Sequence, residues 1–131
     1  MEELPDWPAG TVAILSTGGG EPHAIPVSTA LRTGPRSIVL GLALRRESLA
    51  RLRAEPHCAL TILARGLAFT ARGRAWVVDE GDRIAAVRIA VDRIQDHDQP
   101  TFSIDDGVRW HWTDPDAERG DAAVREALRE L

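Results

Sequence analysis

The apolar residues of this chain fall in short runs, and that spacing is the strongest constraint on its fold. The clearest runs are 11–17, 37–44, 57–63 and 67–78, and glycine, proline or aspartate stands beside most of their ends. Strands alternating regularly with long amphipathic helices are absent, which argues against a doubly wound parallel sheet. The pattern predicts a mainly β protein, an antiparallel barrel with short inserted helices.

Five strands are predicted in the first 80 residues. Their ranges are 11–17, 23–31, 37–44, 57–63 and 67–78. Three consecutive glycines at 18–20 suit a hairpin turn between the first two strands. Because proline cannot donate to a strand ladder, Pro26 implies that the second strand lies at a sheet edge, contains a bulge or has a ligand in place of a ladder partner. Gly73 marks a bend within the long fifth strand.

Helices and a further hairpin are predicted around and after these strands. The expected helices are 47–55, a segment beginning at Asp82 with Ile84, Val87, Val91 and Ile94 on one stripe, and a C-terminal helix within 115–131. Residues 101–104 and 108–112 are expected to pair around the turn at 105–107. Residues 1–10 form an arm that Trp7 anchors to the core.

Length and charge limit what the chain can do. With 131 residues, one domain over 1–131 is expected. The net charge is -4, which argues against a broad basic face for nucleic acid. A single cysteine excludes an intrachain disulfide. With no signal peptide and no membrane-length apolar run visible, we expect a cytoplasmic protein.

The basic residues around the first helix suggest an anion site. All 16 basic residues are arginine, so a phosphate here would be held by arginine, hydroxyls or backbone N–H groups. Arg45, Arg46 and Ser48 stand where an apolar strand leads into the 47–55 helix. The first turn of a helix favours negative charge. The alternatives are solvated arginines and a capping serine.

Other chemistry-bearing residues have weaker signals. Trp110 and Trp112 alternate with His111 and suit either packing or the capping of a planar ligand. His97 lies between Asp96 and Asp98, but three adjacent loop residues seldom converge on one metal ion, so no metal site is predicted. No spacing of a nucleophile and a base argues for hydrolysis.

Several motifs, taken in order, resemble the pyridoxamine 5'-phosphate oxidase-like family of flavin-binding split barrels. The opening hairpin, 12–17 followed by Pro22-His23-Ala24-Ile25-Pro26-Val27, is similar to that of the family. So are the strand 38–44 with its Arg/Ser loop, the segment 52–60 around Pro56, and the strand 72–78. The resemblance covers about 11–78 well and the rest loosely.

The resemblance implies a six-stranded Greek-key split barrel and a homodimer with cofactor sites at the subunit interface. It implies FMN, with the deazaflavin F420 as the alternative and haem in some relatives. The residues expected along the flavin ring are Pro26, Val27, Ser28, Leu42, Ala43 and Leu44. The phosphate is expected at Arg45, Arg46 and Ser48, although Ser48 stands where the family has lysine.

The function that follows from this resemblance is electron or hydride transfer to a small organic substrate. In such enzymes the cofactor carries the chemistry, and the protein supplies binding and orientation. An F420-dependent reductase and a cofactor-free binding or structural dimer are the alternatives.

Overall fold

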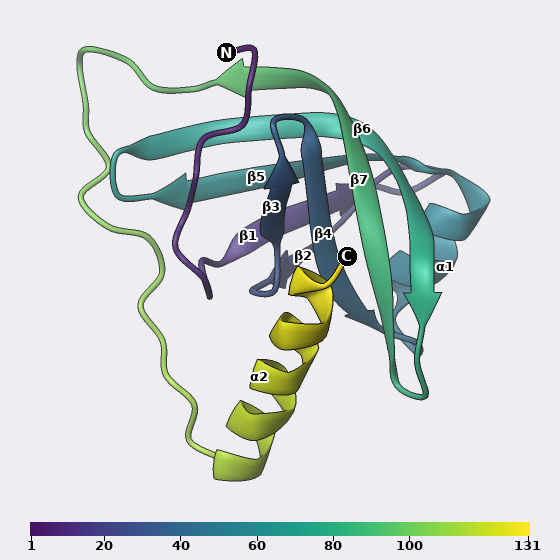
Figure 1. Ribbon diagram of the computed structural model, residues 1–131. Helices are drawn as coiled ribbons and strands as arrows, with labels where there is room; N and C mark the ends of the chain where they lie inside the picture. The colour runs from purple at the N-terminus through teal and green to yellow at the C-terminus, as the bar shows by residue number, and fades with distance from the viewer.

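The computed structural model describes residues 1–131 and consists of one seven-stranded antiparallel sheet with two helices (Figure 1). In chain order the elements are β1 (Ala13–Thr17), β2 (His23–Val27), β3 (Leu31–Gly34), β4 (Ser37–Ala43), α1 (Glu47–Ala54), β5 (His57–Ala64), β6 (Leu67–Glu80), β7 (Ile84–Asp96) and α2 (Pro115–Arg129). The prediction of a mainly β, antiparallel fold is confirmed.

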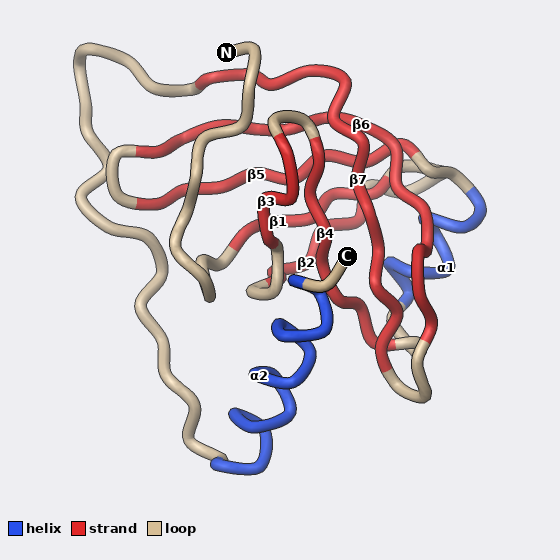
Figure 2. Tube along the Cα trace, in the orientation of Figure 1, coloured by secondary structure: helices blue, strands red, loops and turns tan.

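The sheet order is β2-β1-β5-β6-β7-β4-β3, so β2 and β3 are its two edges. The long strands β6 and β7 curve strongly, and the sheet curls over its own core (Figure 2). The Gly41 N–H of β4 donates a hydrogen bond of 2.9 Å to the Thr29 hydroxyl. Thr29 belongs to the connection between β2 and β3, so this bond holds the segment after β2 against β4.

The core is formed by the side chains that point inward along each strand. Leu15, Ile38, Leu60 and Phe69 are completely buried in one cluster that draws on most of the sheet. Trp7 anchors the N-terminal arm as predicted, because its indole N–H donates to the Ala30 carbonyl at 2.9 Å. Buried side chains alternate with more exposed ones along β1 and β5, as expected for a sheet with one face on the core and the other toward solvent.

Glycine permits two backbone features that the sequence predicted. Gly19 and Gly20 have φ values of 82° and 127°, the left-handed conformations that let the β1–β2 hairpin turn. At Gly73 the pairing of β6 with β7 shifts register. A Cβ atom there would lie 2.0 Å from the Ala90 carbonyl oxygen, so only glycine fits this bulge.

The helix predicted from Asp82 onward is wrong, because residues Ile84–Asp96 form the strand β7. The apolar residues that suggested a helical stripe also fit a strand, and Val87, Ile89 and Val91 point inward at a period of two. Pairing decides between the two patterns. β7 is bonded to β6 on one side and to β4 on the other.

Two further strand predictions are corrected. Residues 101–104 and 108–112 form no hairpin, and the chain between β7 and α2 is irregular. The predicted strand 23–31 ends at Val27, and Leu31–Gly34 forms the separate edge strand β3. The sheet therefore has seven strands, where the resemblance implied six.

Both predicted helices flanking the sheet are present. Pro56 follows α1, and the C-terminal helix extends from Pro115 to Arg129, with Asp114 accepting a hydrogen bond from the Asp116 N–H at its start. The last turns of α2 lie beside β3 and β4 (Figure 1). Leu128 on this helix is buried in one cluster with Val39 and Ala86. Neither helix has the length and apolar character needed to cross a bilayer.

Candidate functional site

The arginines predicted to bind phosphate lie at the junction of β4 and α1. Arg46 is the residue that precedes the first turn of α1, and Arg45 lines a hollow of about 520 Å³ beside it. Both side chains are exposed, and neither forms an ion pair or hydrogen bond within the protein. Arg83 lines the same hollow, and its carbonyl accepts from the Leu44 N–H at 2.8 Å.

Three arginines therefore surround or adjoin one concave surface, and the acidic residue that lines it is Asp82. Unpaired guanidinium groups beside a helix N-terminus can bind a phosphate or carboxylate through charge-assisted hydrogen bonds. The sequence identified Arg45 and Arg46. It missed Arg83 because the segment around it was interpreted as a helix, whereas Arg83 lies in the turn that joins β6 to β7.

Ser48 belongs to a different set of contacts. Its side chain is completely buried, and its hydroxyl lies 3.0 Å from His23 Nε2 on β2. His23 Nδ1 in turn lies 3.3 Å from a carboxylate oxygen of Glu47. Since the carboxylate accepts, Nδ1 carries the proton, and Ser48 donates to Nε2 when His23 is neutral. In this conformation Ser48 fastens α1 to the edge strand β2.

The Glu47 carboxylate, the last of the three groups Ser48, His23 and Glu47, is held in its ionised form. A hydrogen bond from Arg51 at 2.7 Å, with the charge of Arg51 and of His23, lowers the pKa of Glu47 from its ordinary value. Arg51 also donates to the Glu21 carbonyl at 2.7 Å. The start of α1 and the turn before β2 are thus tied together.

The residues predicted to lie along a flavin ring are only partly exposed. Val27 and Leu42 belong to the core, with 8% and 2% of their surface accessible, and of the two only Val27 also borders an outer hollow. Pro26 is exposed and lines this second hollow with Ser28, whereas Ala43 and Leu44 line the arginine hollow. The bond between Thr29 and Gly41 draws these two strand segments together.

Two tryptophans form the other wall of the second hollow, which has a volume of about 360 Å³. Trp110 and Trp112 meet edge to face with ring centroids 5.2 Å apart, and His111, which strand alternation placed on the other face, lines the same hollow. Trp110 donates to the Gly10 carbonyl at 3.0 Å. The indole N–H of Trp112 is buried without a partner. Apolar walls with one free donor are suitable for a flat heterocycle.

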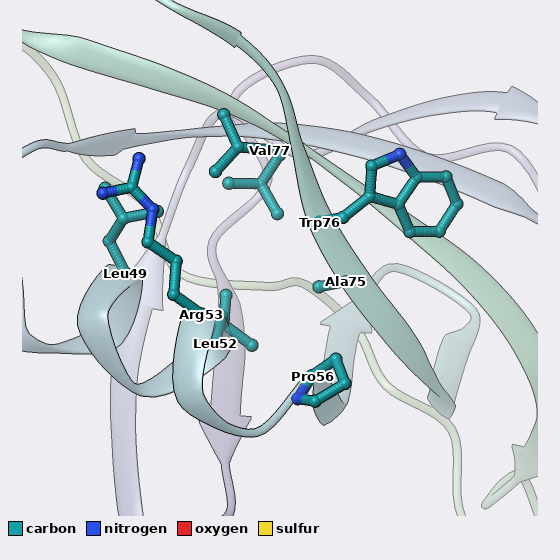
Figure 3. A pocket seen from close by; sticks show the side chains of 8 residues that line it. Leu49, Leu52, Arg53, Pro56, Ala75, Trp76 and Val77 are labelled. Atoms are coloured by element: carbon teal, nitrogen blue, oxygen red, sulfur yellow. The ribbon is translucent and has the colours of Figure 1, made fainter.

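A third hollow, about 340 Å³, was not predicted from the sequence (Figure 3). Leu49, Leu52 and Arg53 of α1 face Ala75 and Val77 of β6 across it, and the Trp76 ring lies on the other side of the β6 ribbon. Arg53 is paired with Glu80 at 2.5 Å on the rim. The apolar spacing of Leu49 and Leu52 indicated a buried helix face, but nothing local indicated which strand it meets.

Comparisons with known proteins place the fold in one class, the split barrel. No protein-family model and no curated protein sequence matches the chain. Solved structures do match. A provisionally assigned pyridoxamine 5'-phosphate oxidase from Listeria innocua superimposes with a TM-score of 0.56 at 15% identity, over 66% of this chain and 88% of that one.

Two other structures extend this comparison. BorF, the flavin reductase component of a bacterial two-component tryptophan halogenase, gives a TM-score of 0.61 at 12% identity, over 69% of this chain and 81% of that one. A heme binding protein from Mycobacterium smegmatis gives 0.55 at 20% identity, over 66% of this chain and 48% of that one. The chain has the fold of the pyridoxamine 5'-phosphate oxidase-like proteins, as the sequence motifs indicated.

Proposed function

We propose that the protein binds a flavin, FMN, and transfers hydride or electrons to a small organic substrate. The observation that carries this proposal is the pair Arg45 and Arg46, two exposed and unpaired arginines beside the start of α1. On a split barrel, the fold of a flavin reductase among the similar structures, this loop is where the sequence motifs predict the phosphate.

The residues would divide the binding of FMN between them. Arg45 and Arg46 would hold the phosphate, and Arg83, which lines the same hollow as Arg45, would add a third positive charge. Pro26, Ser28 and the Trp110–Trp112 pair offer an apolar surface to the ring. A bound flavin supplies the hydride chemistry, and the protein orients the ring and keeps water from it.

A homodimer with the cofactor at the subunit interface is part of the proposal. The support is the position of the predicted ring-binding strand, since β2 is an edge of the sheet and Pro26 on it is exposed. A second subunit would cover the ring on the side that this chain leaves open. The mass of the protein in solution, measured with and without FMN, tests this part.

The position of Ser48 favours two alternatives. A buried hydroxyl that already contacts His23 brings no charge to a phosphate, where the family has lysine. This arrangement is consistent with F420 in place of FMN, or with a dimer that binds no flavin and has a structural or binding role.

A visible spectrum of the purified protein, followed by fluorescence titrations with FMN and F420, separates these functions. We expect saturable binding of FMN. Arg45→Ala and Arg46→Ala should each weaken it by about 1–3 kcal/mol, the size of a charged hydrogen bond. Arg119→Ala, on the exposed face of α2, is the matched control and should change nothing. A protein that binds neither cofactor would refute the oxidoreductase function.

A further inference from the structure

A fourth hollow, about 320 Å³, lies on the outer face of β1 and β5, next to the predicted ring surface. Most of the residues that line it are apolar. Three of these side chains are unusually exposed for large apolar groups: Ile14 at 40%, Leu63 at 50% and Val108 at 64%. Val12 lines both this hollow and the one that contains Pro26 and Trp110. The two hollows therefore adjoin.

One side of the hollow is formed by the irregular segment that was predicted to be a hairpin. Its position is set by close contacts with the β5–β6 turn, where the Gly66 N–H donates to the Ile104 carbonyl at 3.0 Å. A Cβ atom at Gly107 would lie 2.7 Å from the Leu63 carbonyl oxygen. Glycine at 107 thus allows the segment to lie directly against β5 and close one side of the hollow.

Two polar side chains line this mainly apolar surface, those of Asp106 and Thr61. The Asp106 carboxylate accepts from the Gly107 N–H at 2.9 Å, and the Thr61 hydroxyl is held from the side of the sheet. It lies 2.9 Å from the Thr70 hydroxyl on β6, which lies 2.7 Å from His97 Nε2. Thr70 is 6% exposed and pairs directly opposite Thr61 in the sheet. His97 is fixed in turn, because its backbone N–H donates to the Ala68 carbonyl at 2.7 Å. The Thr61 hydroxyl is the outer end of this series of three hydrogen-bonded groups, and it has no other partner within the protein.

The direction of hydrogen bonding in this chain is set at His97. When His97 Nε2 carries a proton, it donates to Thr70, Thr70 donates to Thr61, and Thr61 donates outward. When Nε2 is unprotonated, each bond reverses and Thr61 accepts from a group in the hollow. A cross-strand threonine pair alone stabilises a sheet. The additional histidine makes the outer hydroxyl either a donor or an acceptor.

We propose that this hollow binds a small organic molecule with an apolar body and one hydroxyl or carbonyl group, which Thr61 anchors through Thr70 and His97. Because the hollow adjoins the predicted ring surface, its occupant is the substrate of the proposed oxidoreductase. That assignment as substrate rests on the proposed function, whereas the binding itself does not.

Phenol and benzene test the binding on the full chain without any flavin, so failure of FMN to bind leaves this result intact. In NMR titrations, we expect both probes to shift the methyl signals of Ile14 and Leu63. Thr61→Val, which keeps the side-chain shape, should weaken phenol about 3- to 10-fold, the effect of one neutral hydrogen bond, and leave benzene unchanged. Thr33→Val is the matched control. It removes the 2.9 Å hydrogen bond between the Thr33 and Ser37 hydroxyls, and neither residue lines the hollow.

The connection to His97 has its own readout. Phenol, but not benzene, should move the imidazole Nε2 signal of His97, and Thr70→Val should abolish that response while Thr70→Ser retains it. If phenol shifts the methyl signals of Ile14 and Leu63 without any response at His97, the proposed hydrogen-bond connection from Thr61 through Thr70 to His97 is overturned. Self-association that buries Ile14 and Leu63 and excludes both probes would assign this face to a second copy and overturn the proposal.

Discussion

We expect the single thiol of this protein to lower its stability in alkali, and the composition makes this effect measurable. Cys58 is 8% exposed on the inner side of β5, and burial raises the pKa of its thiol from 9.0 to about 12. The chain contains no tyrosine, and all of its basic side chains other than histidine are arginine. Between pH 9 and 12, Cys58 is therefore the one side chain expected to titrate.

The sign and size of the effect follow from linkage. Below pH 9 the thiol is protonated in both the folded and the unfolded chain, so its contribution to stability is fully present. As the pH rises toward 12, the unfolded chain loses the proton and the folded chain keeps it, so the folded state becomes less stable. One pKa unit corresponds to about 1.4 kcal/mol, which gives a loss of about 2 kcal/mol by pH 10.5.

Urea denaturation, followed by tryptophan fluorescence at pH 8.5, 9.5 and 10.5, measures this loss. Cys58→Ala is the control, and its free energy of unfolding should vary little over the same range. A wild-type stability that stays constant to pH 10.5 would refute the burial argument for the thiol. An equal decline in Cys58→Ala would assign the effect to other groups.

Four further substitutions test stability with the same denaturation assay. Gly73→Ala should destabilise by about 3 kcal/mol, since its Cβ would meet a backbone oxygen 2.0 Å away. Gly120→Ala, in α2 with no atom near its Cβ position, should stabilise by about 0.5–1 kcal/mol, and the opposite order would contradict the bulge. Ser48→Ala should cost about 1–3 kcal/mol because it leaves His23 Nε2 without its partner, and an unchanged midpoint would show that the bond contributes nothing. Phe69→Ala, at a completely buried site, should cost about 3–5 kcal/mol.

The sequence was sufficient for those parts of the fold that local chemistry specifies. The glycines at 18–20, Pro26 at an edge strand and Gly73 at a bulge each have a backbone reason that is visible without a structure. The helix after Arg46 and its end before Pro56 follow from equally local signals. Strand β7 could not be recognised in this way. Its apolar spacing fits both periods, and only pairing with β4 and β6 selects the strand.

The candidate site likewise contains residues that the local sequence identifies and contacts that it does not. Arg45 and Arg46 were identifiable because they adjoin a helix start. The contact between Ser48 and His23 joins residues 25 positions apart, and the hydroxyl chain joins Thr70 to His97 across 27. Such contacts depend on the register of the sheet, which short-range patterns do not fix. His97 illustrates this point, since its neighbours Asp96 and Asp98 suggested a solvated loop and its actual partner lies on β6.

The central claim is that Arg45 and Arg46 bind the phosphate of a flavin, and a comparison of FMN with riboflavin tests it most directly. Riboflavin has the same ring and no phosphate. We predict that the wild-type protein binds FMN at least about tenfold more tightly than riboflavin, and that the Arg45→Ala/Arg46→Ala double variant binds the two equally. Equal binding of FMN and riboflavin by the wild type, or an undiminished preference in the double variant, would contradict this assignment.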